Sequence, residues 1–240
     1  EMAVKAIKQG AFYFIEKPFK SEKLFLIIDR AIENAFLKNK YEIYKENLEN
    51  EDEFIGNTAL INNLKKKIKQ ISGTNARVLI SGESGTGKNL IAKLIHNTSS
   101  RSSKPFITIN CALLNDKNFD NSFFGNFNET NKTLGYIQKA GQGTIFLKEI
   151  CDLEYHIQGK ITNFLQKETY SLSLPTGENE KDDFNANIRF ISSTSKNINQ
   201  EVEKKSLRKD LLYRLNVATL EVPPIKKRRE DIPLIIDHFI

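Results

Sequence analysis

Apolar residues recur at two different spacings through the last three quarters of the chain. Leu60, Leu64 and Ile68 repeat at helical spacing and predict an apolar face on a helix over residues 58–71. Beyond this helix, short apolar runs alternate with helical patterns. This alternation predicts an α/β fold in which helices cover both faces of a doubly wound parallel sheet. The runs that we expect to form strands are Val78–Ser81, Phe106–Asn110, Gly143–Leu147 and Ile188–Ser193.

The first 53 residues follow a different pattern. A helical pattern ends at Gly10, the apolar run Phe12–Ile15 predicts a buried strand, and Ser21 can cap a second helix. Lys and Glu residues then interleave, as in a solvated helical linker. We therefore expect three parts: a helix–strand–helix unit over residues 1–38, a linker over residues 39–53 and a larger domain over residues 54–240.

Three segments of the larger domain carry no chemistry that we can name. Leu153–Leu165 and Leu234–Ile240 are apolar and are expected to be packed helices. The run Thr176–Asn187 is polar and is expected to be a loop.

Composition narrows the class of protein. The chain has 240 residues, of which 39% are hydrophobic, which is enough for a core. It has no apolar run of about 18 residues and no secretory signal, so we expect no membrane contact and a cytoplasmic location. Cys111 and Cys151 are too few for a disulfide framework and lack metal-ligand spacing. The net charge of +6 permits contact with nucleic acid but does not require it.

The most informative motif lies between the first expected strand and the next helical pattern. Gly82–Lys88 reads Gly-Glu-Ser-Gly-Thr-Gly-Lys and matches the phosphate-binding loop pattern in its required strand–loop–helix context. Backbone N–H groups, a helix N-terminus and the charge of Lys88 would together hold a nucleotide triphosphate. The residues that we expect to hold this nucleotide are Gly82, Glu83, Ser84, Gly85, Thr86, Gly87, Lys88 and Asn89.

Further motifs follow in a fixed order and spacing. They are Gly82–Lys88, Asn110–Leu113, Phe124-Gly125, Gly143–Ile150, Leu207–Val217 and Pro223–Pro233. Together they make residues 54–240 resemble the AAA+ ATPase domain of sigma-54-dependent transcription activators, of the NtrC/NtrX type. Residues 1–38 resemble the last helix–strand–helix of a flavodoxin-like receiver domain, whose conserved lysine would be Lys17. The resemblance implies a piece of a longer regulator, whose phosphoacceptor Asp would precede Glu1 and whose helical lid would follow Ile240.

The resemblance also implies a role for each motif. The cofactor would be ATP. Glu149 would polarise the attacking water, and Asn110 would restrain Glu149 until a partner engages. Arg208 and Arg214 would reach the γ-phosphate of a neighbouring subunit, which implies a head-to-tail ring. Ser193-Thr194-Ser195 would lie where the family has a γ-phosphate sensor.

Three departures from the family pattern bear on activity. Lys148 stands where the family has its Mg²⁺-binding Asp, and a lysine repels the metal that neutralises phosphate charge during transfer. We therefore predict no metal ligand and weak hydrolysis. Asn89 replaces a residue that is usually Glu, which we expect to be a mild change. The segment after Phe124-Gly125 is short and lacks the sigma-contacting sequence Gly-Ala-Phe-Thr-Gly-Ala.

The partners that the resemblance implies are a second copy of the chain, sigma-54 RNA polymerase, a sensor histidine kinase acting through the receiver domain, and DNA bound through a C-terminal domain outside this chain. The missing loop argues against the polymerase. Two alternatives stay open: a working AAA+ ATPase that remodels a transcription complex, and a decaying remnant without function.

Simpler interpretations compete with some of these roles. Arg208 and Arg214 could be ordinary ion-pair residues of the surface. The basic runs Lys65–Lys67 and Lys226–Arg229 are expected to be solvated faces rather than nucleic-acid sites. The three histidines His96, His156 and His238 have no catalytic partner in the sequence and are given no role.

Overall fold

The computed structural model describes Tyr13, Ile27 and residues 54–127, 132–167, 169–172, 182–185 and 187–239. The chain divides into two compact units, residues 1–53 and 54–240. The helix–strand–helix and the linker that the sequence predicts before Phe54 lie outside the described residues, Tyr13 and Ile27 apart.

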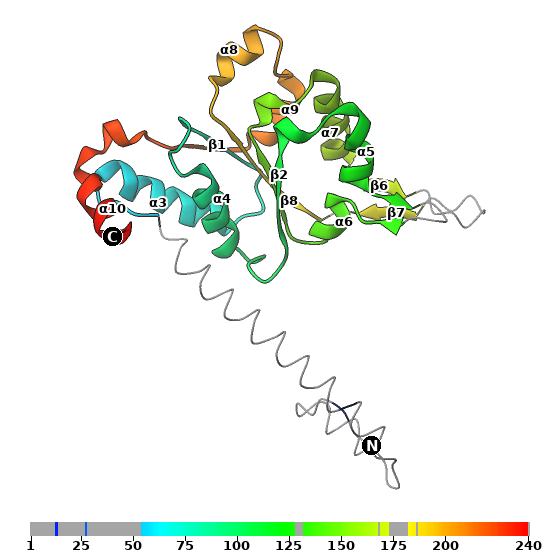
Figure 1. Ribbon diagram of the computed structural model, residues 1–240, viewed down its shortest axis with the longest axis horizontal. Coiled ribbons are helices and arrows are strands. Elements are labelled where there is room, and N and C mark those ends of the chain that lie inside the picture. Colours follow the sequence, from blue (N-terminus) through cyan, green and yellow to red (C-terminus); the bar gives the residue numbers. More distant parts are fainter. Residues whose placement is uncertain are drawn as a thin grey trace. The chain divides into compact units, whose positions relative to one another are not determined.

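A parallel sheet of five strands forms the centre of the second unit (Figure 1). Its strand order is β2-β5-β8-β1-β9, and every neighbouring pair runs parallel. The strands are β1 (Val78–Ser81), β2 (Phe106–Asn110), β5 (Thr144–Lys148), β8 (Arg189–Thr194) and β9 (Ala218–Glu221). Because all five strands point the same way, their carboxyl ends share one edge of the sheet, where ligands bind in folds of this class.

Helices and short hairpins connect the strands. The α-helices are α3 (Ala59–Ser72), α4 (Lys88–Asn97), α5 (Asp116–Phe124), α6 (Tyr136–Ala140), α7 (Tyr155–Lys167), α8 (Ile198–Glu203), α9 (Lys209–Leu215) and α10 (Ile232–Phe239). The 3₁₀ turns are η1 (Cys111–Leu113), η2 (Ile150–Asp152), η3 (Ile225–Lys227) and η4 (Arg229–Asp231). Two antiparallel hairpins pair β3 (Asn126–Phe127) with β4 (Lys132–Thr133) and β6 (Thr169–Leu172) with β7 (Asp182–Asn185).

Side chains alternate between the two faces of the sheet and build a separate core on each. On β5, Ile145 and Leu147 pack with α5, α6, α7 and α9, whereas Phe146 packs with α3 and α4. All three side chains are almost fully buried. Fully burying one such side chain contributes roughly 1.5–3 kcal/mol. The expected doubly wound α/β fold is therefore confirmed.

The observed elements confirm most of the sequence pattern and correct it at three places. The four expected strands form, and the run Leu153–Leu165 becomes α7, with Ile157 and Ile161 buried. The sequence missed β9, which buries only Leu220 fully because it lies at the edge of the sheet. A loop throughout Thr176–Asn187 was the wrong prediction, because residues 182–185 pair with β6.

The third correction concerns the run Leu234–Ile240. The structure confirms a helix there, α10, but not its burial. Leu234 is 38% exposed and Ile236 is 49% exposed in the described part of the chain. The expectation that these residues are packed was therefore wrong.

Both cysteines are free and buried, and no described helix is both long and apolar enough to cross a membrane.

Cations are buried at the amino edge of the sheet, opposite the carboxyl ends of the strands. Arg189 is 2% exposed and donates to carbonyls of Ile71, Ser72 and Ala76 at 2.9 to 3.4 Å. His96 lies nearby, hydrogen-bonded through Nδ1 to Thr144 Oγ1 at 2.9 Å. The histidine given no role from sequence is thus part of the core.

Burial makes His96 a pH-sensitive point of the fold. Burial lowers the pKa of His96 below its usual value, and the charges of Arg189 and Arg101 lower it further, although a hydrogen bond with the Lys104 carbonyl acts the other way. When pH falls below about 6.5, the unfolded chain binds a proton at this residue that the folded chain resists. Stability therefore decreases with falling pH until the lowered pKa is passed.

We expect His96→Gln to reduce the loss of unfolding free energy between pH 7.5 and pH 5.5, because the substituted residue does not titrate. Urea unfolding at the two pH values measures this difference. Asn63→Gln is the control, since Asn63 is exposed on α3, carries no ionisable group and should leave the loss close to that of the unsubstituted chain. An unchanged pH dependence in His96→Gln would contradict the assignment.

Candidate functional site

The loop Gly82–Lys88 joins the carboxyl end of β1 to the start of α4. Gly87, the residue before α4, has a φ of 95°, and a Cβ there would lie 3.1 Å from the Phe54 ring. A Cβ on Gly82 would lie 2.9 Å from the Val222 carbonyl oxygen. These two positions need glycine for space as well as for backbone conformation. The loop therefore has the local geometry that the motif predicts.

Lys88 lies across this loop. Its side chain is 7% exposed, and its Nζ donates to the carbonyls of Gly82 and Glu83 at 2.9 and 3.1 Å. The same ammonium donates to Ser195 Oγ at 2.8 Å and lies 3.5 Å from Glu149 Oε1. An anion that enters the loop would find this charge within it, and a phosphate can replace its neutral carbonyl and hydroxyl acceptors.

Glu149 follows β5 directly and has the left-handed backbone angles φ 55° and ψ 60°. Its carboxylate accepts hydrogen bonds from the backbone N–H and the hydroxyl of Ser195, both at 2.7 Å. A left-handed non-glycine residue is uncommon and persists where its surroundings hold it. Here the two hydrogen bonds from Ser195, the residue after β8, hold the carboxylate beside the phosphate-binding loop.

Ser195 completes the group. The sequence assigned it only loosely, as one of three candidate sensor residues, but its hydroxyl accepts from Lys88 and donates to Glu149. The loop after β1, the end of β5 and the end of β8 thus meet at one point. Lys88, Glu149 and Ser195 can therefore supply a cation that binds an anion, a base and a polar sensor in a single site.

Asn110 ends β2 and caps η1, where its Oδ1 accepts from the Ala112 N–H at 3.3 Å. In this structure the hydrogen bonds to the Glu149 carboxylate come from Ser195 instead. The restraint of Glu149 by Asn110 therefore stays a prediction.

The two candidate arginines lie at α9. Arg208 makes two bonds with Asp210, at 3.0 and 2.8 Å, and its guanidinium lies 5.2 Å from the centre of the Tyr155 ring. These bonds raise the pKa of Arg208 and lower the pKa of Asp210. Arg214 is in the last turn of α9, and its carbonyl accepts from Arg77 at 3.4 Å. Their action on a neighbouring subunit stays a prediction.

A segment far along the chain supports the phosphate-binding loop. Lys226 of η3 pairs with Glu83 at 2.5 Å, and Arg228 Nη2 donates to the Thr86 carbonyl at 3.5 Å. Arg228 is 7% exposed, and its guanidinium lies 5.2 Å from the centre of the Phe54 ring. The expectation of a solvated face for this basic run was therefore wrong for Arg228. The sequence carries no local sign of this burial, because the residues that bury Arg228 lie far from it along the chain.

Asp231 links this segment to the start of α3. Its carboxylate is 1% exposed and accepts from the N–H groups of Asn57 and Thr58 at 2.7 and 3.0 Å and from the Thr58 hydroxyl at 2.7 Å. Buried carboxylates are tolerated only when they are bonded in this way. Asp231 therefore connects the segment that supports the phosphate-binding loop to the residues just after Phe54.

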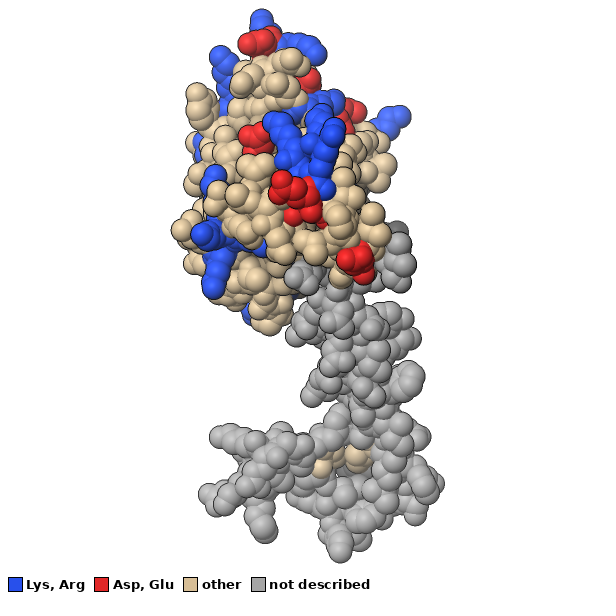
Figure 2. Space-filling model, turned by 90° about the vertical axis from the view of Figure 1, so that its left-hand side faces the viewer, with Lys and Arg blue, Asp and Glu red and all other residues tan. Residues whose placement is uncertain are grey.

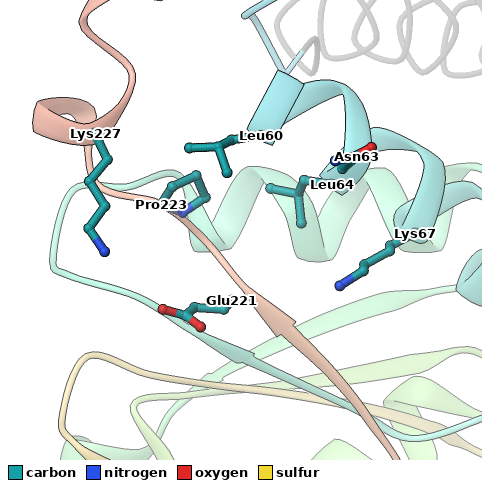
Figure 3. Close-up of a pocket in the computed structure, with 7 residues that line it drawn as sticks. All are labelled: Leu60, Asn63, Leu64, Lys67, Glu221, Pro223 and Lys227. Carbon is teal, nitrogen blue, oxygen red and sulfur yellow. The ribbon is translucent and has the colours of Figure 1, made fainter. Parts of the chain in front are cut away.

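A charged face and a pocket involve residues outside the phosphate-binding loop. Lys and Arg side chains gather beside acidic ones on the face that includes α3 and α10 (Figure 2). A pocket of about 340 Å³ lies between α3 and the chain around the end of β9. Figure 3 shows the side chains that line it. The residues that line it are Leu60, Asn63, Leu64, Lys67, Glu221, Pro223 and Lys227. None of these residues belongs to the loop.

The residues at the carboxyl edge do not fit a Mg²⁺ site. The metal prefers carboxylate oxygens, yet Lys148 ends β5, and the position after Lys88 holds the exposed amide Asn89. The carboxylates of Glu83, Glu149 and Asp152 are each paired with a lysine. Within the described ranges no three His, Cys, Asp or Glu residues form a group that could hold a metal.

Comparison with known proteins is consistent with this geometry. Residues 54–221 match the family described as the sigma-54 interaction domain. The nitrogen assimilation regulatory protein NtrX of Azorhizobium caulinodans is 36% identical over 242 residues, which cover all of this chain and 52% of that protein. The chain therefore spans about half the length of the curated relatives it matches.

Solved structures of a related protein give the same result. NtrX from Brucella abortus, solved as crystal structures in complex with ADP and with ATP, is 34% identical in sequence to this chain. Both superpose with a TM-score of 0.76 and cover all of this chain, which corresponds to 53% and 54% of those chains.

We expect Asp231→Ala to lower the free energy of unfolding by about 3 kcal/mol, because it leaves three donors near the start of α3 without their acceptor. Chemical denaturation measures the change. Asp237→Ala, an exposed site on α10, is the control and should change stability by less than about 0.5 kcal/mol. Equal effects of the two substitutions would argue against the supporting role of Asp231.

Proposed function

Because the chain belongs to the sigma-54 interaction domain family, we propose that it is the ATP-binding part of a two-component transcription regulator that hydrolyses ATP weakly or not at all. The observation that carries the proposal is the arrangement at the carboxyl edge. An intact phosphate-binding loop lies beside Glu149 and Ser195, while Lys148 stands at the end of β5. The nucleotide complexes of the related Brucella NtrX support ATP and ADP as the ligands.

The contrast between binding and hydrolysis rests on charge. Lys88 and the loop N–H groups supply what phosphate binding needs. Hydrolysis also needs stabilisation of the charge that develops during transfer. Lys148 stands at the position where the family has an acidic residue that would organise a metal for this purpose. Glu149 remains in place beside the loop, so the base is retained while the electrostatic part of the chemistry is weakened.

The family's output on sigma-54 RNA polymerase is not part of the proposal. The segment between Phe124 and Gly135 lacks the sequence Gly-Ala-Phe-Thr-Gly-Ala, and its described ends pair only as the two-residue strands β3 and β4. We propose that the nucleotide controls assembly of the regulator instead. Control by a sensor kinase and binding to DNA would depend on the receiver domain and on a domain outside this chain.

Assembly into a ring is supported by the surface around α9. Tyr213 is 80% exposed and Val217 is 63% exposed, next to the candidate arginine fingers Arg208 and Arg214. Exposed apolar side chains beside arginines are typical of the core of a protein interface. A head-to-tail contact here would bring the arginines toward the nucleotide of the next subunit.

We expect the purified chain to bind ATP in calorimetry and to release phosphate slowly. Lys88→Ala should weaken ATP binding at least about tenfold, because it removes a charge-assisted hydrogen bond to phosphate. Lys66→Ala, an exposed lysine on α3, is the matched control. Failure of the unsubstituted chain to bind ATP would favour a remnant without function.

Lys148→Asp should raise magnesium-dependent phosphate release by roughly 100-fold, since a metal contributes several kcal/mol to charge stabilisation in the transition state. A phosphate-release assay on both proteins makes the comparison. If the unsubstituted chain is already fast and the substitution changes little, the chain is a working ATPase and the proposal of weak hydrolysis fails.

We expect Tyr213→Ser to shift the nucleotide-bound chain toward monomer in sedimentation velocity, because interface aromatics dominate association energy. Leu60→Ser removes an apolar side chain that is 50% exposed on α3 and should leave assembly unchanged. An assembly insensitive to Tyr213 would place the subunit contact elsewhere.

A further inference from the structure

The position of Lys148 relative to the phosphate-binding loop follows from one hydrogen bond and the geometry of two elements. His96 near the end of α4 bonds to Thr144 at the start of β5, at 2.9 Å. From His96 back to Lys88 the helix rises about 12 Å, and from Thr144 forward to Lys148 the strand rises about 13 Å. Lys88 and Lys148 are therefore at the same level, at the carboxyl edge.

The face of the sheet on which Lys148 lies follows from strand alternation. Phe146 belongs to the core cluster that packs against α4. Residues two apart on a strand share a face, so Lys148 lies on the same face as Phe146, under the start of α4. This is the face from which the loop Gly82–Lys88 rises. The Lys88 ammonium lies only 3.5 Å from the carboxylate of the next residue, Glu149, which agrees with this placement.

The ammonium of Lys148 is uncommitted, in contrast to its neighbours. Lys88 pairs with Glu149, Lys196 with Asp152 and Lys226 with Glu83. Within the part of the chain that the structure describes, the Lys148 ammonium makes neither a hydrogen bond nor an ion pair, although the residue is partly buried. A partly buried cation without a counter-charge favours an anionic ligand.

We propose that Lys148 is a phosphate-binding residue that takes the place of the divalent cation, so that the site binds a nucleoside triphosphate free of metal. The inference rests on the proposed function, since it assumes that the loop binds ATP. Two ammonium groups, Lys88 and Lys148, would face the β- and γ-phosphates from two sides. A point charge on a flexible stem suits this role, because it needs no fixed coordination geometry.

The proposal reverses the usual dependence on magnesium. In sites that use the metal, it cancels phosphate charge that the protein would otherwise have to neutralise. Here Mg²⁺ bound to the phosphates would bring a second positive charge close to Lys148. Magnesium should therefore weaken ATP binding to this chain, and a chelator should leave it unchanged or strengthen it.

Calorimetric titration of the full chain with ATP, once in excess EDTA and once in excess Mg²⁺, tests the inference directly. The expected result is binding in EDTA at least as tight as binding in Mg²⁺. Binding that requires Mg²⁺ would overturn the inference and leave the proposed nucleotide binding intact. Absence of ATP binding under both conditions would overturn both.

Substitutions then locate the effect. Lys148→Met should weaken binding in EDTA about tenfold or more, as expected for loss of a charge-assisted bond to phosphate. Lys148→Asp should make binding dependent on Mg²⁺. Lys66→Met is the matched control and should behave as the unsubstituted chain, and thermal unfolding verifies that each variant is folded. Equal affinity of Lys148→Met and the unsubstituted chain in EDTA would overturn the inference.

Discussion

Burial on both faces of the five parallel strands determines where polar chemistry can lie in this domain. Each strand alternates its side chains between two cores, so helices must cover both faces and no room remains there for an open polar site. The two edges are what is left. The amino edge buries Arg189 and His96 against carbonyls and a hydroxyl. The carboxyl edge carries Lys88, Glu149 and Ser195, whose side chains bond to one another.

The phosphate-binding loop depends on residues that are distant in the sequence. Lys226 pairs with Glu83 and Arg228 reaches the Thr86 carbonyl, while Asp231 caps the chain beside Phe54. These contacts connect the loop to the chain that leads into α10. A change in the loop on nucleotide binding would therefore act on this segment through one ion pair and one hydrogen bond. The loop and the segment Pro223–Asp231 form one unit.

Local patterns were sufficient for the elements whose own residues carry several apolar side chains or a glycine-rich motif. Four strands and the loop Gly82–Lys88 could be predicted because each carries its signal within a few residues. Strand β9 could not, since Ala218–Glu221 has only one large apolar residue, Leu220. Arg228 and Asp231 could not be assigned either, and Ser195 only as one of three candidates, because their partners lie far away in the chain. Whether a charged side chain is buried depends on these distant partners, and a run of basic residues does not reveal whether such partners exist.

The pairing of β1 has a consequence for how the chain reaches this state. The strand that leads into the loop pairs on one side with β8 and on the other with β9, so Val78 lies beside Ala218. Asp231 caps Thr58 across 173 positions. Contacts so distant in sequence make folding slow, because a long loop must close before they form. During synthesis, β1 therefore emerges long before its partners and has to remain protected from other chains until the last strand arrives.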